Sequence, residues 1–234
     1  MITEEIIKEI ISNSEKDYAK WVAPILQVTE GGYGENDKLY GVRTPILRKI
    51  AKKYYNISTN DLEVLLHDDY HEIRMLALMI LIHKYKTEKY KKENYVKIYL
   101  NNADYINNWD LVDVSAPNIV GDYVYTNRDK LDILYDLSNK NHIWKQRIAI
   151  VSTQYLIKKR FYEPTIKLSE KYLNHPHHLI HKAVGWMLRE LGKQDIKELY
   201  SFLDKYANKM PRVMLRYAIE RLPEVERKFY LGVK

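Results

Sequence analysis

The residues 107–117, NNWDLVDVSAP, place an indole and two carboxylates within five positions of a chain rich in Lys and Arg. Trp109 and Asp113 are four residues apart, so a helix brings both side chains to one face. A carboxylate at such a position is costly to bury without a partner. Asp113 is therefore expected either to pair with a basic side chain or to face a cleft where its charge has a use.

The residues around this pair suggest a helix that starts and stops abruptly. Asn108 can cap it, and Asp110 then lies in the first turn, where the helix dipole favours a negative charge. Pro117 has no N–H to donate to the Asp113 carbonyl, so the helix must kink or end there. Asp110 thus has a structural role, while Asp113 either forms a salt bridge with Arg147 or serves in a cleft.

Other potential sites are weaker. His177 and His181 have the spacing of a helical zinc pair, but no Glu follows the first His as in metalloprotease helices, and no metal site is predicted. Trp186 lies among apolar helix residues and is either a core residue or a second cleft wall. The glycine-rich segment 29–41 lacks a phosphate-loop ending and is expected to be a plain connector. No Ser-His-Asp set or dinucleotide fingerprint is present.

The elements that carry these residues all have helical patterns, and no strand pattern stands out. Gly192 is expected to end the helix that contains Trp186. The expected helices cover six stretches: 14–28, 44–55, 71–86, 127–140, 144–159 and 179–193.

A basic residue followed by apolar ones recurs in four of the helices. Arg74, Arg147, Lys182 and Arg216 are separated by 73, 35 and 34 residues, and the first gap is about two periods. Paired helices with a period of about 35 residues are typical of α-solenoids. The recurring bases are either ordinary helix-surface charges or a positive track along one concave wall. In this register, Asp113 occupies a slot that the other repeats fill with small or apolar residues.

Bulk composition fits a soluble globular protein, with 46 % hydrophobic and 29 % charged residues in 234 positions. The absence of Cys excludes disulfides and thiolate metal sites, and the acidic N-terminus does not resemble a signal peptide. We therefore expect a cytoplasmic, monomeric protein with no membrane association. Ten Lys/Arg against three acids lie between Trp144 and Lys193, which matches the net charge of +7 and favours a polyanionic partner.

The chain resembles the DNA alkylation repair proteins of the AlkD type, which are glycosylases for alkylated purines. The similarity runs from about residue 40 to 195 and includes the W-D-x-V-D core with its following P-x-x-x-G-D, and the G-W-x-L-R-E helix. One position departs from the pattern, because Asn108 stands where some relatives have an aromatic residue. The matching segments are YGVRTPILRKIAKKY, HEIRMLALMILIHKY, NNWDLVDVSAPNIVGD, WKQRIAIVSTQYLIKK and LIHKAVGWMLRELGKQD, and the tail MPRVMLRYAIERLP is also similar.

The resemblance implies a single HEAT-like repeat domain over 1–234, an all-α curved solenoid with a concave basic groove that binds duplex DNA. It implies Asp113 as the catalytic carboxylate, Trp109 and Trp186 as cleft indoles, and Arg147 as the arginine beside the carboxylate. Lys182, one of the recurring basic residues, is predicted as a further DNA contact. It implies hydrolysis of N3-alkyladenine and N7-alkylguanine without base flipping, and no cofactor or metal.

Two other functions remain open from the sequence. The chain could bind distorted duplex DNA without catalysis, which predicts salt-dependent binding but no base release. It could also be a helical scaffold for protein partners, which predicts no DNA affinity at physiological salt.

Overall fold

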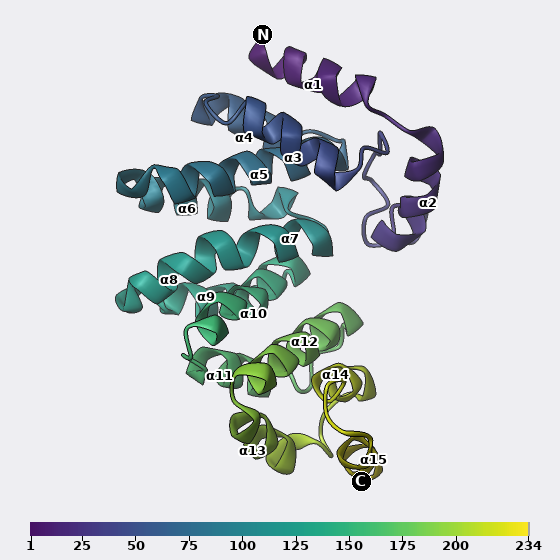
Figure 1. The fold of residues 1–234 in the computed structure, drawn as a ribbon, viewed down its shortest axis with the longest axis vertical. Coiled ribbons are helices and arrows are strands. Elements are labelled where there is room, and N and C mark those ends of the chain that lie inside the picture. Colours follow the sequence, from purple (N-terminus) through teal and green to yellow (C-terminus); the bar gives the residue numbers. More distant parts are fainter. Residues whose placement is uncertain (234) are drawn as a thin grey trace. The chain divides into compact units, whose positions relative to one another are not determined.

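The computed structural model describes residues 1–233, and over that range the regular structure is entirely helical (Figure 1). The prediction of an all-α fold is therefore confirmed. The chain divides into two compact units, unit 1 over Met1–Ser115 and unit 2 from Ala116 onward. The single HEAT-like domain and the concave groove stay predictions. The helices of unit 1 are α1 (Ile2–Ser12), α2 (Lys16–Leu26), α3 (Thr44–Lys53), α4 (Thr59–Leu66), α5 (His71–Thr87), α6 (Lys92–Asn101) and α7 (Trp109–Ala116).

Helix α5 is the centre of unit 1. Its sequence is apolar around most of its circumference, as expected for a helix surrounded by protein. Helices α1, α3, α4 and α6 all pack against it, and Figure 1 shows α3 and α4 lying over α5. Ile73, Leu76 and Leu81 are fully buried, and each such side chain stabilises the fold by about 1.5–3 kcal/mol. This rigid layer positions the first residues of α5, which lie at the candidate site.

Unit 2 repeats the same construction around α10 and α12. Helix α10 packs against α9, α11 and α12, and α12 packs against α13 and α14. Neighbouring helices that cover a buried central helix are the arrangement of α-solenoids. Besides a π-helical turn at Pro117–Gly121, the unit contains α8 (Asp122–Thr126), α9 (Asp132–Asn139), α10 (Ile143–Lys158), α11 (Glu163–Lys171), α12 (His178–Gln194), α13 (Ile196–Tyr206), α14 (Arg212–Ala218) and α15 (Glu224–Gly232).

Two predicted helix ends have different outcomes. The predicted break at Pro117 is confirmed, because α7 ends at Ala116 and a π-helical turn begins at Pro117. The predicted end of a helix at Gly192 is wrong, because α12 continues to Gln194. A Cβ at Gly192 would lie 2.4 Å from a Leu199 methyl carbon. The glycine therefore serves the close packing of α13 on α12 and does not terminate the helix.

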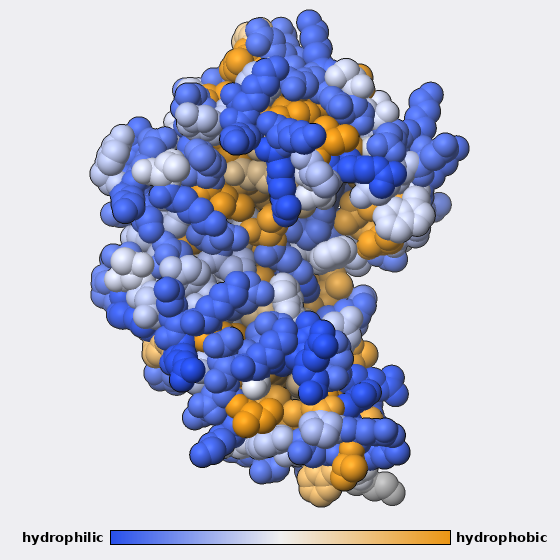
Figure 2. Space-filling view, viewed as in Figure 1, coloured by the Kyte–Doolittle hydropathy of each residue, from blue (hydrophilic) through white to orange (hydrophobic). Residues whose placement is uncertain are grey.

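The surface is mainly hydrophilic, and apolar side chains show between the helices of each unit (Figure 2). Some large apolar side chains are exposed, among them Phe229 and Val225 on α15, at 64 % and 80 %. No helix in residues 1–233 is both long enough and apolar enough to span a bilayer.

Candidate functional site

Trp109 and Asp113 both lie on α7, with Trp109 as its first residue and Asp113 one turn further on. The Trp109 indole Nε1 donates a hydrogen bond to the Ile25 carbonyl of α2 over 3.4 Å, which restrains the ring. Asp113 is partly exposed, so its carboxylate is not enclosed in the core. The two side chains therefore stand at the surface of unit 1 on a helix whose start is fixed.

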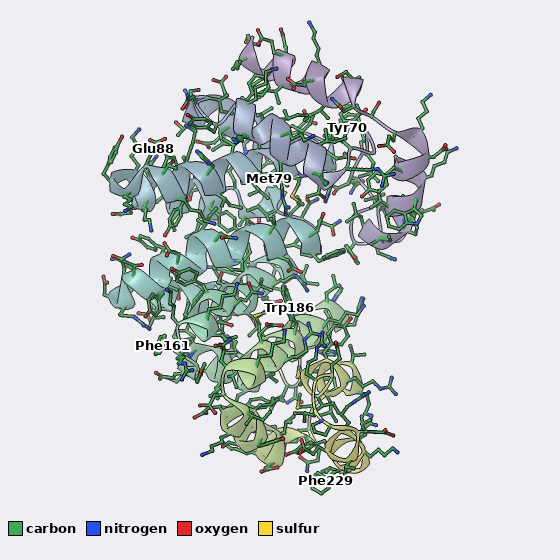
Figure 3. All side chains as sticks on the ribbon, viewed as in Figure 1. Tyr70, Met79, Glu88, Phe161, Trp186 and Phe229 are labelled. Atoms are coloured by element: carbon green, nitrogen blue, oxygen red, sulfur yellow. The ribbon has the colours of Figure 1, made fainter. Side chains whose placement is uncertain are left out.

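Asp113 lines a cleft of about 430 Å³ in unit 1, which we call the α7 cleft. Apolar side chains from α2 and α5 form much of its wall, among them Trp21, Ile25 and Met79, the last of which is labelled in Figure 3. Trp21 is 62 % exposed, which is unusual for a tryptophan. The carboxylates on the wall are Glu72, Asp110 and Asp113. Aromatic and carboxylate groups together suit a ligand that is both apolar and cationic.

A largely buried histidine in the wall of this cleft bridges two carboxylates. The His71 Nε2 atom lies 2.8 Å from an oxygen of Asp110, and its Nδ1 atom lies 3.2 Å from an oxygen of Asp37. The side chains of His71 and Asp37 are only 4 % and 3 % exposed, while Asp110 is 21 % exposed. An ionised carboxylate can only accept hydrogen bonds, whereas a neutral imidazole has one N–H. Two carboxylate neighbours therefore require both ring nitrogens to carry protons.

Arg74 completes this group and balances its charge. Its Nη2 atom lies 2.7 Å from Asp37 and donates to the Asn107 side chain over 2.9 Å, and Nη1 donates to the Asp68 carbonyl over 2.7 Å. Two cations thus face two carboxylates in a largely buried site, which offsets the cost of removing the charges from water. We call His71, Asp37, Asp110 and Arg74 the buried charge cluster. Arg74 therefore fits neither alternative for the recurring bases, a helix-surface charge or an exposed positive track, because its side chain is buried and paired with Asp37.

The surroundings of His71 shift its pKa upward despite its burial. Burial favours the neutral ring, but the charge and hydrogen bond of Asp110 and the hydrogen bond of Asp37 outweigh it and raise the pKa to about 9. Burial acts to raise the pKa of Asp37. The hydrogen bonds from His71 and Asn107 and the charge of Arg74 outweigh burial, so the pKa of Asp37 is lowered. These surroundings favour the imidazolium form of His71 at neutral pH.

Glu72 fixes the segment that supplies Asp37. Its carboxylate accepts hydrogen bonds from the backbone N–H groups of Tyr40, Gly41 and Val42 over 3.1, 2.6 and 3.2 Å. Gly41 has a φ of +79°, and a Cβ there would lie 2.2 Å from the Glu15 carbonyl oxygen. The segment was expected to be a plain connector, but its backbone is held tightly and it delivers a carboxylate to the buried charge cluster.

The start of α7 is anchored a second time by Asn108. This residue is fully buried, its side-chain oxygen accepts from the Trp109 N–H over 2.8 Å, and its amide donates to the Leu26 carbonyl over 2.9 Å. Asn108 thus stands at the helix start as predicted, and it also joins α7 to the end of α2. An amide fits this enclosed position because both its donor and its acceptor find partners.

Arg147, the predicted companion of Asp113, lies on α10 in unit 2. Its side chain is buried, and Nη1 donates to the Leu179 carbonyl over 2.8 Å. The roles implied by the resemblance, holding a phosphate or pairing with Asp113, stay predictions. The observed hydrogen bond joins α10 to the first turn of α12 and gives Arg147 a structural task within unit 2.

Trp186 and Lys182 lie one turn apart on α12, and both are partly exposed. The Trp186 indole, labelled in Figure 3, donates to Glu190 over 3.2 Å. Its polar edge is thus fixed while part of the ring stays accessible. Several neighbouring cations of the basic window are ion-paired, including Lys167 with Glu163. Lys182 has no ion-pair partner within residues 1–233, so its charge is available to a ligand.

The histidines at 175–181 have partners within the protein. The His177 ring accepts from the Leu179 N–H at the start of α12, and the His175 ring lies 2.9 Å from the Gln146 side-chain oxygen. Burial lowers the pKa of His175, His177 and His178, so these rings are neutral at pH 7. No three His, Asp or Glu side chains of the described part of the chain lie close enough together to hold a metal ion.

No local sequence pattern pointed to Asp37, His71 or the aromatic wall at Trp21. Asp37 stands in a glycine-rich segment, 34 residues before His71. His71 stands at the start of an apolar helix, 39 residues before Asp110. The one available hint was a histidine and an arginine, His71 and Arg74, one turn apart at the start of a buried helix. Local patterns cannot reveal which distant carboxylates meet them.

Comparison with known proteins gives a consistent result. Residues 6–222 match the family model described as DNA alkylation repair enzyme. A solved structure described as a predicted DNA alkylation repair enzyme from Enterococcus faecalis is similar in fold, with a TM-score of 0.70 and 15 % identity over 91 % of this chain and 98 % of that one. No curated protein matches the chain.

Proposed function

Because the chain belongs to the family of DNA alkylation repair enzymes, we propose that it is a DNA glycosylase. Its substrates are cationic alkylated purines in duplex DNA, N3-alkyladenine and N7-alkylguanine, and it hydrolyses their N-glycosidic bond. The observation that carries the proposal is a partly exposed carboxylate, Asp113, on the wall of a cleft that also contains indole rings.

The chemistry of the lesion explains why such a carboxylate suffices. An alkylated purine already carries a positive charge and is a good leaving group. As the bond breaks, positive charge spreads onto the deoxyribose, as in other oxocarbenium-like transition states. A carboxylate in a fixed position opposes that charge and can orient the attacking water. Asp113 meets this requirement because hydrogen bonds of Asn108, Trp109 and Asp110 hold the start of α7, one turn before it.

Aromatic and basic side chains have supporting roles in this proposal. The faces of Trp109 and Trp186 stabilise the cationic base through their quadrupoles. Lys182 binds a phosphate of the DNA backbone. Arg147, which is buried, supports the site through the hydrogen bond that joins α10 to α12. The reaction proceeds without flipping of the base, because partly exposed side chains such as Trp109 and Asp113 can approach the sugar from the backbone side.

Base release from methylated duplex DNA tests the proposal. We expect the wild-type protein to release N3-methyladenine and N7-methylguanine, and Asp113→Asn to be slower by about 10²–10³-fold, the usual loss for one group that stabilises transition-state charge. Asp104→Asn is a matched control, because Asp104 is an exposed aspartate in the same unit, and it should keep wild-type activity. Undiminished release by Asp113→Asn would contradict the mechanism.

The same assay separates the other two functions. Salt-dependent binding to duplex DNA without release of any base would identify a non-catalytic DNA-binding protein. Absence of DNA affinity at physiological salt would favour a protein scaffold. Base flipping is tested with 2-aminopurine placed beside a stable lesion analogue, where a large rise in fluorescence on binding would contradict an unflipped base.

A further inference from the structure

We propose that His71 is a positioning residue of the candidate site, a buried imidazolium that holds Asp110 and thereby fixes the first turn of α7. The role assigned to α7 rests on the proposed function. The charge state of His71 does not, because it follows from the geometry of the buried charge cluster alone.

The first step is the proton count. Both ring nitrogens of His71 face carboxylate oxygens, at 2.8 Å from Asp110 and 3.2 Å from Asp37. A neutral ring would present a lone pair to one of these anions. Burial makes that lone-pair repulsion costly, because the side chains of His71 and Asp37 are almost completely enclosed and water does not screen it. Burial and the charge of Arg74 act against the cationic form, and the two carboxylates that face His71 outweigh them.

The His71 ring holds the first turn of α7 through Asp110. Asp110 is the second residue of α7, and its other oxygen accepts from the Leu111 N–H over 2.9 Å. Since α5 is the buried centre of unit 1, its first residue, His71, is a fixed point from which to hold α7. Trp109 precedes Asp110 and Asp113 follows it by three positions, so a shift at Asp110 moves both.

The third step concerns charge. Asp110 and Asp113 lie on neighbouring turns of one helix and both line the α7 cleft, so two negative charges there repel each other. An imidazolium against Asp110 neutralises the first charge. It therefore reduces the repulsion that Asp110 exerts on Asp113, the position at which the reaction would use a negative charge.

A double-mutant cycle tests the role of His71. His71→Gln keeps a hydrogen-bond donor but removes the positive charge, and we expect base release to slow by about 100-fold, the effect of a displacement of about 1 Å in a reacting group. Adding Asp110→Asn removes the carboxylate that lost its counter-ion. The double variant should recover at least about tenfold over His71→Gln, corresponding to a coupling of about 1.4 kcal/mol.

The control is His67→Gln. His67 is a histidine of the same unit, but its side chain is exposed and its ring lies 2.5 Å from the amide oxygen of Asn102 and not from a carboxylate. We expect a change of about twofold at most, the range of substitutions outside critical contacts. A double variant no faster than His71→Gln would overturn the proposal, because a purely packing role for the ring cannot be rescued at Asp110.

The proton count is measured directly by ¹⁵N NMR of the histidine rings at pH 7.5, with His71→Gln used for assignment. Protons on both ring nitrogens are expected, and a neutral ring would overturn the proposal. If the wild-type protein releases no base, the proposed function fails, and the inference is then decided by these spectra and by whether Asp110→Asn restores the thermal stability lost in His71→Gln. A neutral His71 ring, or no recovery of thermal stability in the double variant, would overturn the inference.

Discussion

The buried charge cluster should make the stability of unit 1 depend on pH in a narrow alkaline window. The pKa of His71 is raised from 6.5 to about 9 in the folded protein. A group whose folded pKa is raised contributes its full stabilisation below the unfolded pKa and loses it as the pH rises through the folded pKa. The contribution of His71 is therefore complete below pH 6.5 and is lost progressively towards pH 9.

The size of the effect follows from the same shift. A pKa raised from 6.5 to about 9 corresponds to about 3 kcal/mol of folding free energy. The imidazole is fully buried, so solvent does not screen it. For a domain of this size, the loss lowers the melting temperature by about 6–12 °C.

The shifted pKa values of Asp37 and of the histidines at 175–178 do not change stability between pH 6.5 and 9. Asp37, whose pKa is lowered, loses its contribution only under acidic conditions. His175, His177 and His178 have lowered pKa values, so their contribution is lost as the pH falls below 6.5 and is constant above it. A decline in stability between pH 6.5 and 9 therefore reports on His71 and the groups that face it.

Thermal and urea unfolding at pH values from 6.5 to 9 measures the effect. The wild-type protein should lose stability across this range, His71→Gln should be less stable at pH 6.5 and show almost no slope, and His67→Gln should keep the wild-type slope. A wild-type stability that stays constant or rises from pH 6.5 to 9 would refute the reasoning, because His71 would then be neutral in the folded state.

Three further predictions concern the backbone, the DNA contacts and the start of α7. Gly41→Ala should destabilise unit 1 by more than about 2 kcal/mol in urea unfolding, because a positive φ costs about 1–2 kcal/mol and the new Cβ meets the Glu15 carbonyl; Gly31→Ala, with a φ of +75° but nothing within 4 Å, should show the conformational cost alone. Arg48 lines the α7 cleft and has no ion-pair partner within the described residues. Arg48→Gln should therefore reduce the slope of log K against log salt concentration for DNA binding by about 0.9. An unchanged slope would place that side chain outside the DNA contact. Asn108→Ala leaves the Leu26 carbonyl without its donor and should cost about 1–3 kcal/mol of stability; a loss below 0.5 kcal/mol would mean that this anchor is not needed.

Much of the fold was accessible from the sequence because helices are set by local patterns. Apolar residues at helical spacing predicted the helices on which the candidate residues lie, and the missing N–H of Pro117 predicted the end of α7. Gly192 was misjudged because a glycine that terminates a helix and a glycine that admits a neighbouring helix look alike in sequence. The sequence shows only that a glycine is present, and the packing of α13 on α12 shows that its missing side chain makes room for Leu199.

The candidate site divides in the same way. Trp109, Asp110 and Asp113 could be singled out because they stand within five residues, and helical geometry alone relates them. The cleft they face and the cation beneath Asp110 could not, since His71 and Asp37 meet only when α5, α7 and the segment before α3 pack together. Charges separated by more than thirty residues leave no periodic trace in the sequence, and only the tertiary structure decides which of them are neutralised and which stay at the surface.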